Sequence, residues 1–378
     1  MEILEEREKC TGCGACVNSC PKGCISFKLN KDGFYYPVVN DKECVLCNKC
    51  KAVCPILNEQ KKHSSLTLYS AYSMDNDSIL HSSSGAIFPL IAKHIIDLQG
   101  VVFGAAFSQD FTKVEHVCVQ RVEDVVKLQS SKYVQSDIGL SYRLAKQFLD
   151  DGRYVLFSGT PCQIAGLYSY LGNKEYERLF TQDIICFGIP SPFVWEKYVK
   201  EIKSKYGDIS YVNFRDKSTC WQDSCVKIGN YVAKKSEDYY MKSFLERYNV
   251  RESCFNCKFR DRHRISDITL ADFWGIEEVS PRMYNKNGTS MIFVHSNKGE
   301  ILFNAIKDKI VSNIEDADNS LRNNIRIEKN MDPNIDREEF LKHIKKYSVE
   351  KSYKLCNKEK RQSIIEKIKI KAKGMFGR

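Results

Sequence analysis

The chain has 378 residues, of which 43% are hydrophobic and 28% are charged, an ordinary balance for a globular protein with two or three domains. It has no run of 18 apolar residues, and its first nine residues are mostly charged. We therefore expect a cytoplasmic protein without a membrane-spanning helix or a signal peptide. Residues 342–378 hold 13 Lys/Arg and 3 Asp/Glu, a difference that equals the whole net charge of +10. The remaining body is formally neutral, which does not indicate a nucleic-acid-binding surface.

Two cysteine runs near the start share one spacing, and each ends in proline. Nine of the 17 cysteines lie in the first 54 residues, and eight of them form Cys10-x2-Cys13-x2-Cys16-x3-Cys20-Pro21 and Cys44-x2-Cys47-x2-Cys50-x3-Cys54-Pro55. Three closely spaced thiolates can wrap one face of a [4Fe–4S] cubane, and the fourth follows a short turn. A zinc site explains neither the third thiolate nor the Cys-Pro ending. The runs therefore predict two [4Fe–4S] clusters and one-electron transfer, with Cys24 as a small buried residue outside the pattern.

The runs resemble those of two-cluster ferredoxins, in which the fourth cysteine of each run ligates the other cluster. By this resemblance one cluster takes Cys10, Cys13, Cys16 and Cys54, and the other takes Cys44, Cys47, Cys50 and Cys20. Each half of the module then depends on the other. The sequence between the runs predicts a short hairpin, and the polar residues 58–65 predict a linker.

From residue 68 onward, strand patterns alternate with helix patterns, which predicts an α/β domain with a mixed sheet. The expected strands are 68–73, 100–107, 114–119, 154–157 and 181–186. The expected helices are 85–98, 138–149, 163–171 and 192–206.

Short segments of this body carry groups suited to binding. The serines of 82–85 open a helix, which suits an anion such as a flavin pyrophosphate, although serines there also serve as plain N-caps. Residues 130–135 form either a polar site or an exposed turn. Cys162 follows a strand and a tight turn at a helix start, where we expect a lowered thiol pKa. Together with Cys186, Cys254 and Cys257 it could hold a third cluster, while Cys254-x2-Cys257 alone could be half a zinc site or a redox disulfide.

Six segments in co-linear order carry a resemblance that covers roughly residues 1–300. They are Ser82-Ser-Ser-Gly85, Ser131–Ser136, Phe157–Leu167, Cys186–Pro192, Cys254-x2-Cys257 and Ser266–Gly275. In this order they resemble the beta subunit of coenzyme F-420 hydrogenase/dehydrogenase, in the bacterial form fused to an N-terminal ferredoxin. The resemblance implies a ferredoxin domain at 1–60, the N-terminal and C-terminal domains of that subunit at 66–180 and 181–345, and a basic tail at 346–378. It also implies a flavoprotein core that transfers electrons between a two-electron carrier such as coenzyme F-420 and [4Fe–4S] clusters.

By carry-over from the family, FAD would contact residues of the serine–glycine loop and of the Ser-Lys-Tyr segment. These candidates are Ser83, Ser84, Gly85, Lys132, Tyr133 and Gln135. The third cluster would take Cys162, Cys186, Cys254 and Cys257 and would lie between the flavin and the ferredoxin domain. One departure is Ala86, which stands where the family often has a second glycine. No catalytic acid or base can be assigned, and we expect Asp267 and Asp272 to cap backbone groups.

Residues 361–378 predict a basic amphipathic helix that suits an anionic membrane surface on the inner side, an acidic partner or the protein's own body equally well. Three functions are open. The first is an FAD- and iron–sulfur-dependent oxidoreductase of the deazaflavin-linked type, with a redox partner protein or a small electron carrier. The second is a reductase of the same superfamily acting on another substrate, such as a pigment or a sugar intermediate of surface-polysaccharide synthesis. The third is a non-catalytic electron-relay subunit.

Overall fold

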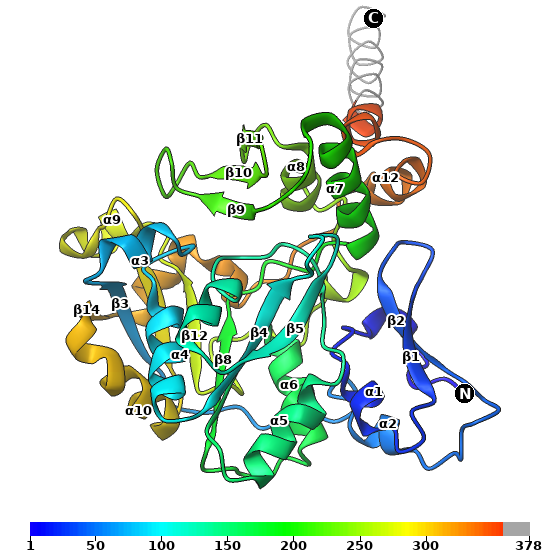
Figure 1. Ribbon diagram of the computed structural model, residues 1–378, viewed down its shortest axis with the longest axis horizontal. Coiled ribbons are helices and arrows are strands. Elements are labelled where there is room, and N and C mark those ends of the chain that lie inside the picture. Colours follow the sequence, from blue (N-terminus) through cyan, green and yellow to red (C-terminus); the bar gives the residue numbers. More distant parts are fainter. Residues whose placement is uncertain (358–378) are drawn as a thin grey trace, which may run out of the picture.

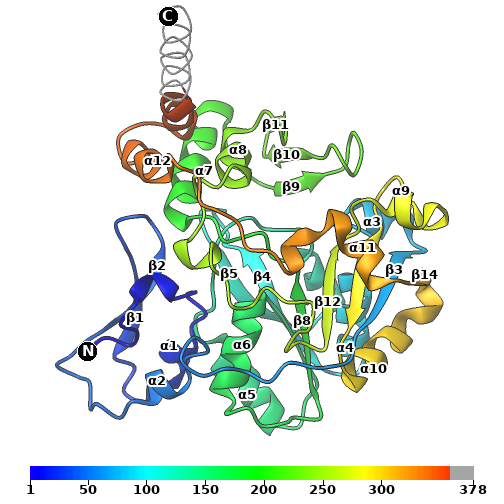
Figure 2. The ribbon, with the colours of Figure 1, turned by 180° about the vertical axis from the view of Figure 1, so that it is seen from behind.

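The computed structural model describes residues 1–357. A large sheet lies at the centre of the molecule, the N-terminal domain packs beside it, and a small sheet with its helices lies at one end (Figure 1). The view from behind shows the same three parts (Figure 2). The expected helix at 361–378 lies outside the described residues. Within residues 1–357, no helix is both long and apolar enough to cross a membrane.

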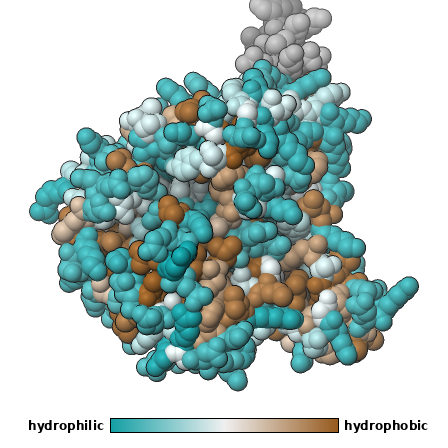
Figure 3. Space-filling view, viewed as in Figure 1, coloured by the Kyte–Doolittle hydropathy of each residue, from teal (hydrophilic) through white to brown (hydrophobic). Residues whose placement is uncertain are grey.

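The N-terminal domain consists of two short helices and the expected hairpin. Strands β1 (Ile25–Leu29) and β2 (Tyr35–Val39) pair antiparallel. Helix α1 (Ala15–Ser19) lies in the first cysteine run and α2 (Lys49–Ala52) in the second. A residue in the left-handed region, Gly14 or Asn48, precedes each helix and turns the chain sharply around its cysteines. On the face seen in Figure 3, hydrophobic side chains gather where this domain adjoins the central part of the molecule.

The central sheet has nine strands in the order β14-β3-β13-β12-β8-β7-β4-β5-β6. The strands β12, β8, β7 and β4 run parallel, while β13, β3 and β14 pair antiparallel with their neighbours. Strand β5 pairs antiparallel with β4 and parallel with β6. This confirms the predicted mixed sheet of an α/β domain. The strands are β3 (Thr67–Ser73), β4 (Val101–Phe107), β5 (Val114–Val119), β6 (Ser136–Asp137), β7 (Val155–Ser158), β8 (Leu179–Ile184), β12 (Ile268–Asp272), β13 (Ser290–Val294) and β14 (Ile310–Glu315).

Helices cover both faces of this sheet (Figure 2). Helices α4 (Ile87–Asp97) and α10 (Asn297–Ile306) pack on one face, and α5 (Ser141–Asp150) and α6 (Pro161–Tyr170) pack on the other. Successive residues of β7 alternate between the two cores, so that Leu156 faces the first pair of helices and Phe157 the second. Full burial of such a side chain contributes about 1.5–3 kcal/mol. Short helices α3 (Asn76–Leu80), α9 (Ile276–Val279) and α11 (Ala317–Ser320) lie in the connections.

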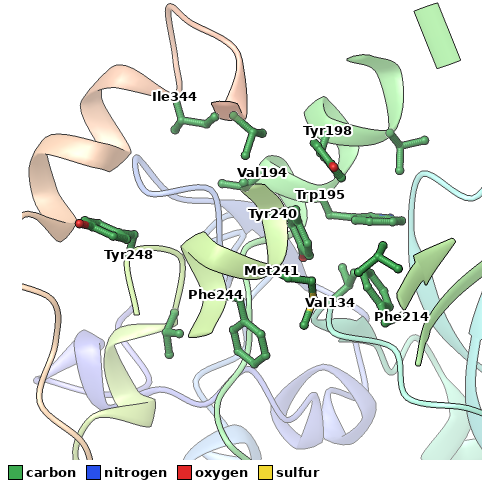
Figure 4. Close-up of a cluster of buried hydrophobic side chains, with 14 of the residues drawn as sticks. Val134, Val194, Trp195, Tyr198, Phe214, Tyr240, Met241, Phe244, Tyr248 and Ile344 are labelled. Carbon is green, nitrogen blue, oxygen red and sulfur yellow. The ribbon is translucent and has the colours of Figure 1, made fainter. Parts of the chain in front are cut away.

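A second core supports a three-stranded sheet for which the sequence predicted no strands. It contains β9 (Val212–Asp216), β10 (Cys225–Ile228) and β11 (Tyr231–Lys234), with helices α7 (Pro192–Tyr206), α8 (Tyr239–Leu245) and α12 (Arg337–His343). Aromatic side chains fill the space between them (Figure 4). The Trp195 ring lies edge-on to the Tyr240 ring at 5.1 Å between centroids, a geometry that adds to simple burial. This core holds the small sheet against the central sheet.

Candidate functional site

The eight cysteines of the two runs line two separate cavities in the N-terminal domain. One cavity, of about 200 Å³, is lined by Cys10, Cys13, Cys16 and Cys54. The other is lined by Cys20, Cys44, Cys47 and Cys50. In both cavities the last cysteine of one run joins the first three of the other, as the crossover pattern predicts. Among residues 1–357, no group of three His, Cys, Asp or Glu side chains converges on a site for a single metal ion.

Cys24 is buried, as expected, but it also lines the second cavity. Its Sγ lies 3.4 Å from Cys20 Sγ, within the range of a thiol hydrogen bond. Five thiols therefore line this cavity, whereas the spacing pattern assigns only four cysteines to it; Cys24 is the fifth.

The four remaining candidate ligands come together from distant parts of the chain and line a third cavity. Cys162 lies in the first turn of α6, Cys186 follows β8, and Cys254 and Cys257 lie in and after a short 3-10 helix. The expected lowering of the Cys162 pKa is wrong. Burial raises the pKa of the Cys162 thiol, and the neighbouring Cys257 and Cys186 raise it further. Desolvation at this depth outweighs the favourable position at a helix start.

Helix α6 connects this third cavity to the first one. Thr11 lines both cavities. One turn after Cys162, the helix approaches the N-terminal domain so closely that a Cβ atom on Gly166 would lie 3.1 Å from Cys13 Sγ. The Tyr142 hydroxyl lies 2.7 Å from the Cys13 carbonyl oxygen and 2.8 Å from the Gln163 carbonyl oxygen, and both accept from it. The third cysteine set therefore adjoins the first set of the N-terminal domain.

A fully buried arginine crosses the same boundary. The Arg251 Nε donates to the Cys10 carbonyl at 2.8 Å, and its Nη1 donates to the Tyr35 carbonyl at 2.9 Å. The Gln135 Oε1 accepts from Arg251 Nη1 at 3.2 Å, and a Cβ atom on Gly12 would touch the Gln135 amide. Gln135, predicted as a flavin contact, thus faces the N-terminal domain and is not among the residues that line the large cavity described next.

The large cavity has a volume of about 470 Å³ and lies at the carboxyl ends of the parallel strands β7, β8 and β12. Ligands of open α/β sheets bind at this end of the strands. The candidate flavin contacts Ser83, Ser84, Lys132 and Tyr133 line it. Cys186 lines both this cavity and the third cysteine cavity, so the two spaces meet at one thiol.

Contacts with neighbouring segments fix the serine loop at the wall of this cavity. The Ser83 Oγ accepts from the Ser131 backbone N–H at 2.7 Å, and the Ser84 hydroxyl donates to the Thr289 carbonyl at 2.8 Å. Gly85 lies against strand β3, where a Cβ atom would come within 2.5 Å of the Ala71 carbonyl oxygen. A glycine is therefore required at position 85 by close packing.

The family departure at position 86 has a conformational cost. Ala86 adopts φ 60° and ψ 41°, the left-handed region, immediately before α4. An L-residue with a Cβ atom pays about 1–2 kcal/mol for this conformation, whereas glycine does not. The backbone there explains why a second glycine is suited to this position.

The cavity wall is strongly cationic. It contains Lys132, Arg215, Lys235 and Arg326, while its single acidic residue is Asp272. Burial lowers the pKa of Lys132 to about 7, and burial also lowers the pKa of Lys235. An anionic ligand would relieve the cost of holding these cations out of water.

Asp272 corrects one sequence expectation, because it does not cap backbone groups. Its carboxylate pairs with Arg215 Nη1 at 2.6 Å and accepts from Trp221 Nε1 at 3.1 Å. The Trp221 ring stacks on Trp274 with 4.9 Å between centroids. Asp267, in contrast, is fully buried and accepts from the Thr181 backbone N–H at 2.8 Å. Sequence analysis did not identify Arg215, Trp221 or Lys235 as site residues. The nearest signal was the family resemblance of residues 266–275, because Asp272 in that segment binds Arg215 and Trp221.

Comparisons with known proteins identify two segments of the chain. Residues 9–57 match the 4Fe-4S dicluster domain model. Residues 152–320 match the model for the C-terminal region of the coenzyme F420 hydrogenase/dehydrogenase beta subunit, and this range contains all four cysteines of the third set. Over this range the chain is similar to the coenzyme F420 hydrogenase/dehydrogenase beta subunit family. The chain carries a ferredoxin-type 4Fe-4S domain near its start, and the family resemblance predicted from the sequence is confirmed.

Individual relatives extend the comparison. The chain is 26% identical over 332 residues to a coenzyme F420-dependent sulfite reductase of Methanocaldococcus jannaschii, a match that covers 82% of this chain and 48% of the relative. It thus spans about half the length of that protein. A ferredoxin-like protein from Rhizobium leguminosarum is 43% identical over 56 residues, which are 13% of this chain and 80% of that protein. A solved chain of the F420-reducing [NiFe] hydrogenase complex of Methanosarcina barkeri gives a TM-score of 0.46 at 16% identity, covering 67% of this chain and 82% of that one.

Proposed function

We propose that this protein is a flavin-dependent oxidoreductase that transfers electrons between a two-electron carrier and a row of three [4Fe–4S] clusters. The observation that carries the proposal is the continuity of the cavities. The large cavity meets the third cysteine cavity at Cys186, and that cavity meets the first ferredoxin cavity at Thr11. A two-electron site is therefore followed by three sites that each accept one electron.

FAD is the proposed occupant of the large cavity. Its volume of about 470 Å³ lies within the range of about 300–1,000 Å³ found for cofactor sites. The flavin would supply the step between hydride and single-electron chemistry. The chain itself would orient the cofactor with the serine loop, neutralise its phosphates with Lys132 and Arg215, and exclude water with Trp274, whose ring Trp221 supports by stacking. Gln135 is left out of this contact set because its side chain lies at the boundary with the N-terminal domain.

The proposed cluster ligands are the three cysteine sets that line the cavities. The first takes Cys10, Cys13, Cys16 and Cys54, the second Cys20, Cys44, Cys47 and Cys50, and the third Cys162, Cys186, Cys254 and Cys257. The burial that raises the pKa of the Cys186 and Cys254 thiols to about 12 makes cluster binding release protons from these cysteines.

Anaerobic purification followed by iron, sulfide and flavin analysis tests the proposal. We expect about twelve iron atoms, four for each of three clusters, and one flavin per chain. About eight irons without flavin would refute the enzyme and leave an electron-relay subunit. Lys132→Gln should weaken flavin retention about tenfold or more, because a charge-assisted contact contributes about 1.5–3 kcal/mol. Lys127→Gln is the matched control, since Lys127 is exposed and pairs with Asp124.

The carrier is proposed to be a deazaflavin of the coenzyme F-420 type, with a redox partner protein or a small electron carrier at the ferredoxin end. The cationic wall supports an anionic substrate of this kind. Reduced deazaflavin and reduced nicotinamide should be compared as donors to the loaded enzyme. Oxidation of neither would redirect the proposal to another reductase of the superfamily, acting on a different substrate.

The basic tail at 346–378 is proposed to contact an anionic membrane surface or an acidic partner. A variant that lacks residues 361–378 should lose binding to anionic liposomes while its cofactor content stays unchanged. Equal liposome binding by the full and shortened chains would contradict the membrane role.

A further inference from the structure

Three arginines surround the third cysteine cavity, and no aspartate or glutamate lines it. They are Arg260, Arg264 and Arg326, which we name the arginine collar. Arg264 is 3% exposed. Within residues 1–357, the buried Nε groups of Arg260 and Arg264 have no hydrogen-bond partner. A buried cation with an unused donor is costly unless an anion or acceptor faces it.

The other nitrogens of these side chains are anchored to backbone carbonyls. Arg260 Nη2 donates to the Phe187 carbonyl at 2.7 Å, and its Nη1 donates to the Lys329 carbonyl at 3.1 Å. Arg264 Nη1 donates to the Phe259 carbonyl. The guanidinium groups are therefore fixed in place while one donor of each stays unused. Asp183 is the acidic neighbour of Arg264, but it is not part of the cavity wall, and burial raises its pKa.

The cations of the collar also repel one another. Partial burial and the charges of Arg260 and Arg247 lower the pKa of Arg326. Like charges gathered at one cavity are stable only with an anion between them. A [4Fe–4S] core with four thiolates carries about two negative charges, which suits this role.

The ferredoxin cavities differ from this one in their charged lining. The first cavity, whose cysteines are mostly buried, contains Glu2, Asp41 and Arg7. The second contains Lys22 and Lys49, which are exposed and therefore screened by water. Among the three cysteine cavities, a net positive lining that includes a buried arginine is thus a property of the third. Cluster potentials follow net charge and hydrogen bonds to the sulfurs.

We propose that the arginine collar donates hydrogen bonds to the third cluster and holds its reduction potential above that of the first ferredoxin cluster. This inference rests on the third cluster of the proposed function. Each cluster accepts one electron, so two electrons that arrive together leave the large cavity in two separate transfers. The first electron reduces the third cluster, which lies next to that cavity, before the lower-potential ferredoxin cluster is reduced. The collar therefore acts as a positioning and potential-setting group.

The test is a redox titration of the anaerobically purified full chain, in which the electron paramagnetic resonance signal of each cluster is recorded at every potential. In the wild type, one cluster should titrate at a higher potential than the first ferredoxin cluster. Arg326→Gln and Arg260→Gln should each lower the reduction potential of this cluster by at least about 59 mV. For one electron this shift corresponds to a tenfold change in the equilibrium constant of reduction. Arg326→Lys keeps the charge and should shift it less. Arg322→Gln, an exposed arginine outside the cavity wall, should leave all potentials unchanged.

The outcomes separate the inference from the function on which it rests. About eight irons per chain in the wild type would remove the third cluster and overturn both. About twelve irons with unchanged potentials in both glutamine variants would overturn the collar alone. A third cluster that titrates below the first ferredoxin cluster would also overturn it. Equal shifts of all three clusters would show a global change in structure and would likewise refute a local role.

Discussion

At Gly166, helix α6 of the body lies directly against the N-terminal domain, and Gly166→Ala tests this contact. The added methyl would lie 2.9 Å from the Tyr142 hydroxyl oxygen and 3.1 Å from both Cβ and Sγ of Cys13. Overpacking of a filled site costs about 1–3 kcal/mol. Displacing the Tyr142 hydroxyl would also weaken its hydrogen bonds to two carbonyls, at about 0.5–1.5 kcal/mol each.

A gain in helix propensity opposes these costs. Gly166 lies inside α6, and alanine is more favourable than glycine in a helix interior by about 0.5–1 kcal/mol. The balance predicts a net destabilisation of about 1–3 kcal/mol at the boundary between the two parts. It should appear as a roughly tenfold to hundredfold faster loss of the visible iron–sulfur absorbance in guanidinium.

The clash can be separated from other effects by Tyr142→Phe, which removes the hydroxyl that the new methyl would meet. In this background Gly166→Ala should accelerate cluster loss less than it does in the wild type. The four proteins form a double-mutant cycle, measured anaerobically with the same cluster content. Strictly additive rates would refute the clash with the Tyr142 hydroxyl. A Gly166→Ala variant as durable as the wild type would refute the close contact between α6 and Cys13.

Three further predictions concern the large cavity. Ala86→Gly should stabilise the protein by about 1 kcal/mol, read as a raised Tm, because glycine is not strained at φ 60°; a lowered Tm would contradict this. Asp272→Asn should destabilise it by about 3–5 kcal/mol, measured in the same way, because Arg215 would remain as a buried unpaired cation; a change below 1 kcal/mol would show that the pair is solvated. Burial lowers the pKa of His116 to about 4. Between pH 6.5 and 4 the unfolded chain binds a proton at this histidine and the folded chain does not, so the free energy of unfolding falls as the pH falls through this range. His116→Gln should therefore reduce the acid loss of stability by about 3 kcal/mol, and parallel pH profiles would refute this.

The sequence could predict the parts of this molecule that rest on local pattern. Each cysteine run places three ligands of one cluster close together in the sequence, so spacing alone indicated two ferredoxin clusters, while the exchange of the fourth ligand came from the resemblance to two-cluster ferredoxins. The strand at 114–119 and the helix at 192–206 have the predicted bounds, because their apolar spacing matches the core that covers them. The third cysteine set was different, since residues 162 to 257 are joined only by the tertiary fold. Their turn-like contexts left several kinds of site open, and the family resemblance favoured a third cluster.

What the sequence could not predict depends on packing between distant elements. Arg215 lies in β9 and Asp272 in β12, and their ion pair forms only because the small sheet closes over the large cavity. The pKa of Cys162 was expected to fall on the basis of its helix position, whereas desolvation by the assembled cavity raises it. Burial depends on the whole fold, and for this reason the local motif predicted the wrong direction for the pKa of Cys162.

Helix α6 explains how the proposed sites can keep a fixed spacing. Thr160, the N-cap of α6, lines both the large cavity and the third cysteine cavity. Cys162 belongs to the third set, and Gly166 touches the first set at Cys13. Because a helix rises about 1.5 Å per residue, these three contacts lie within about 9 Å along one rigid element. The capping box of Thr160 and Gln163 secures the first turn of the helix, so the spacing of the proposed cluster sites is fixed by the length of one helix and not by a loop.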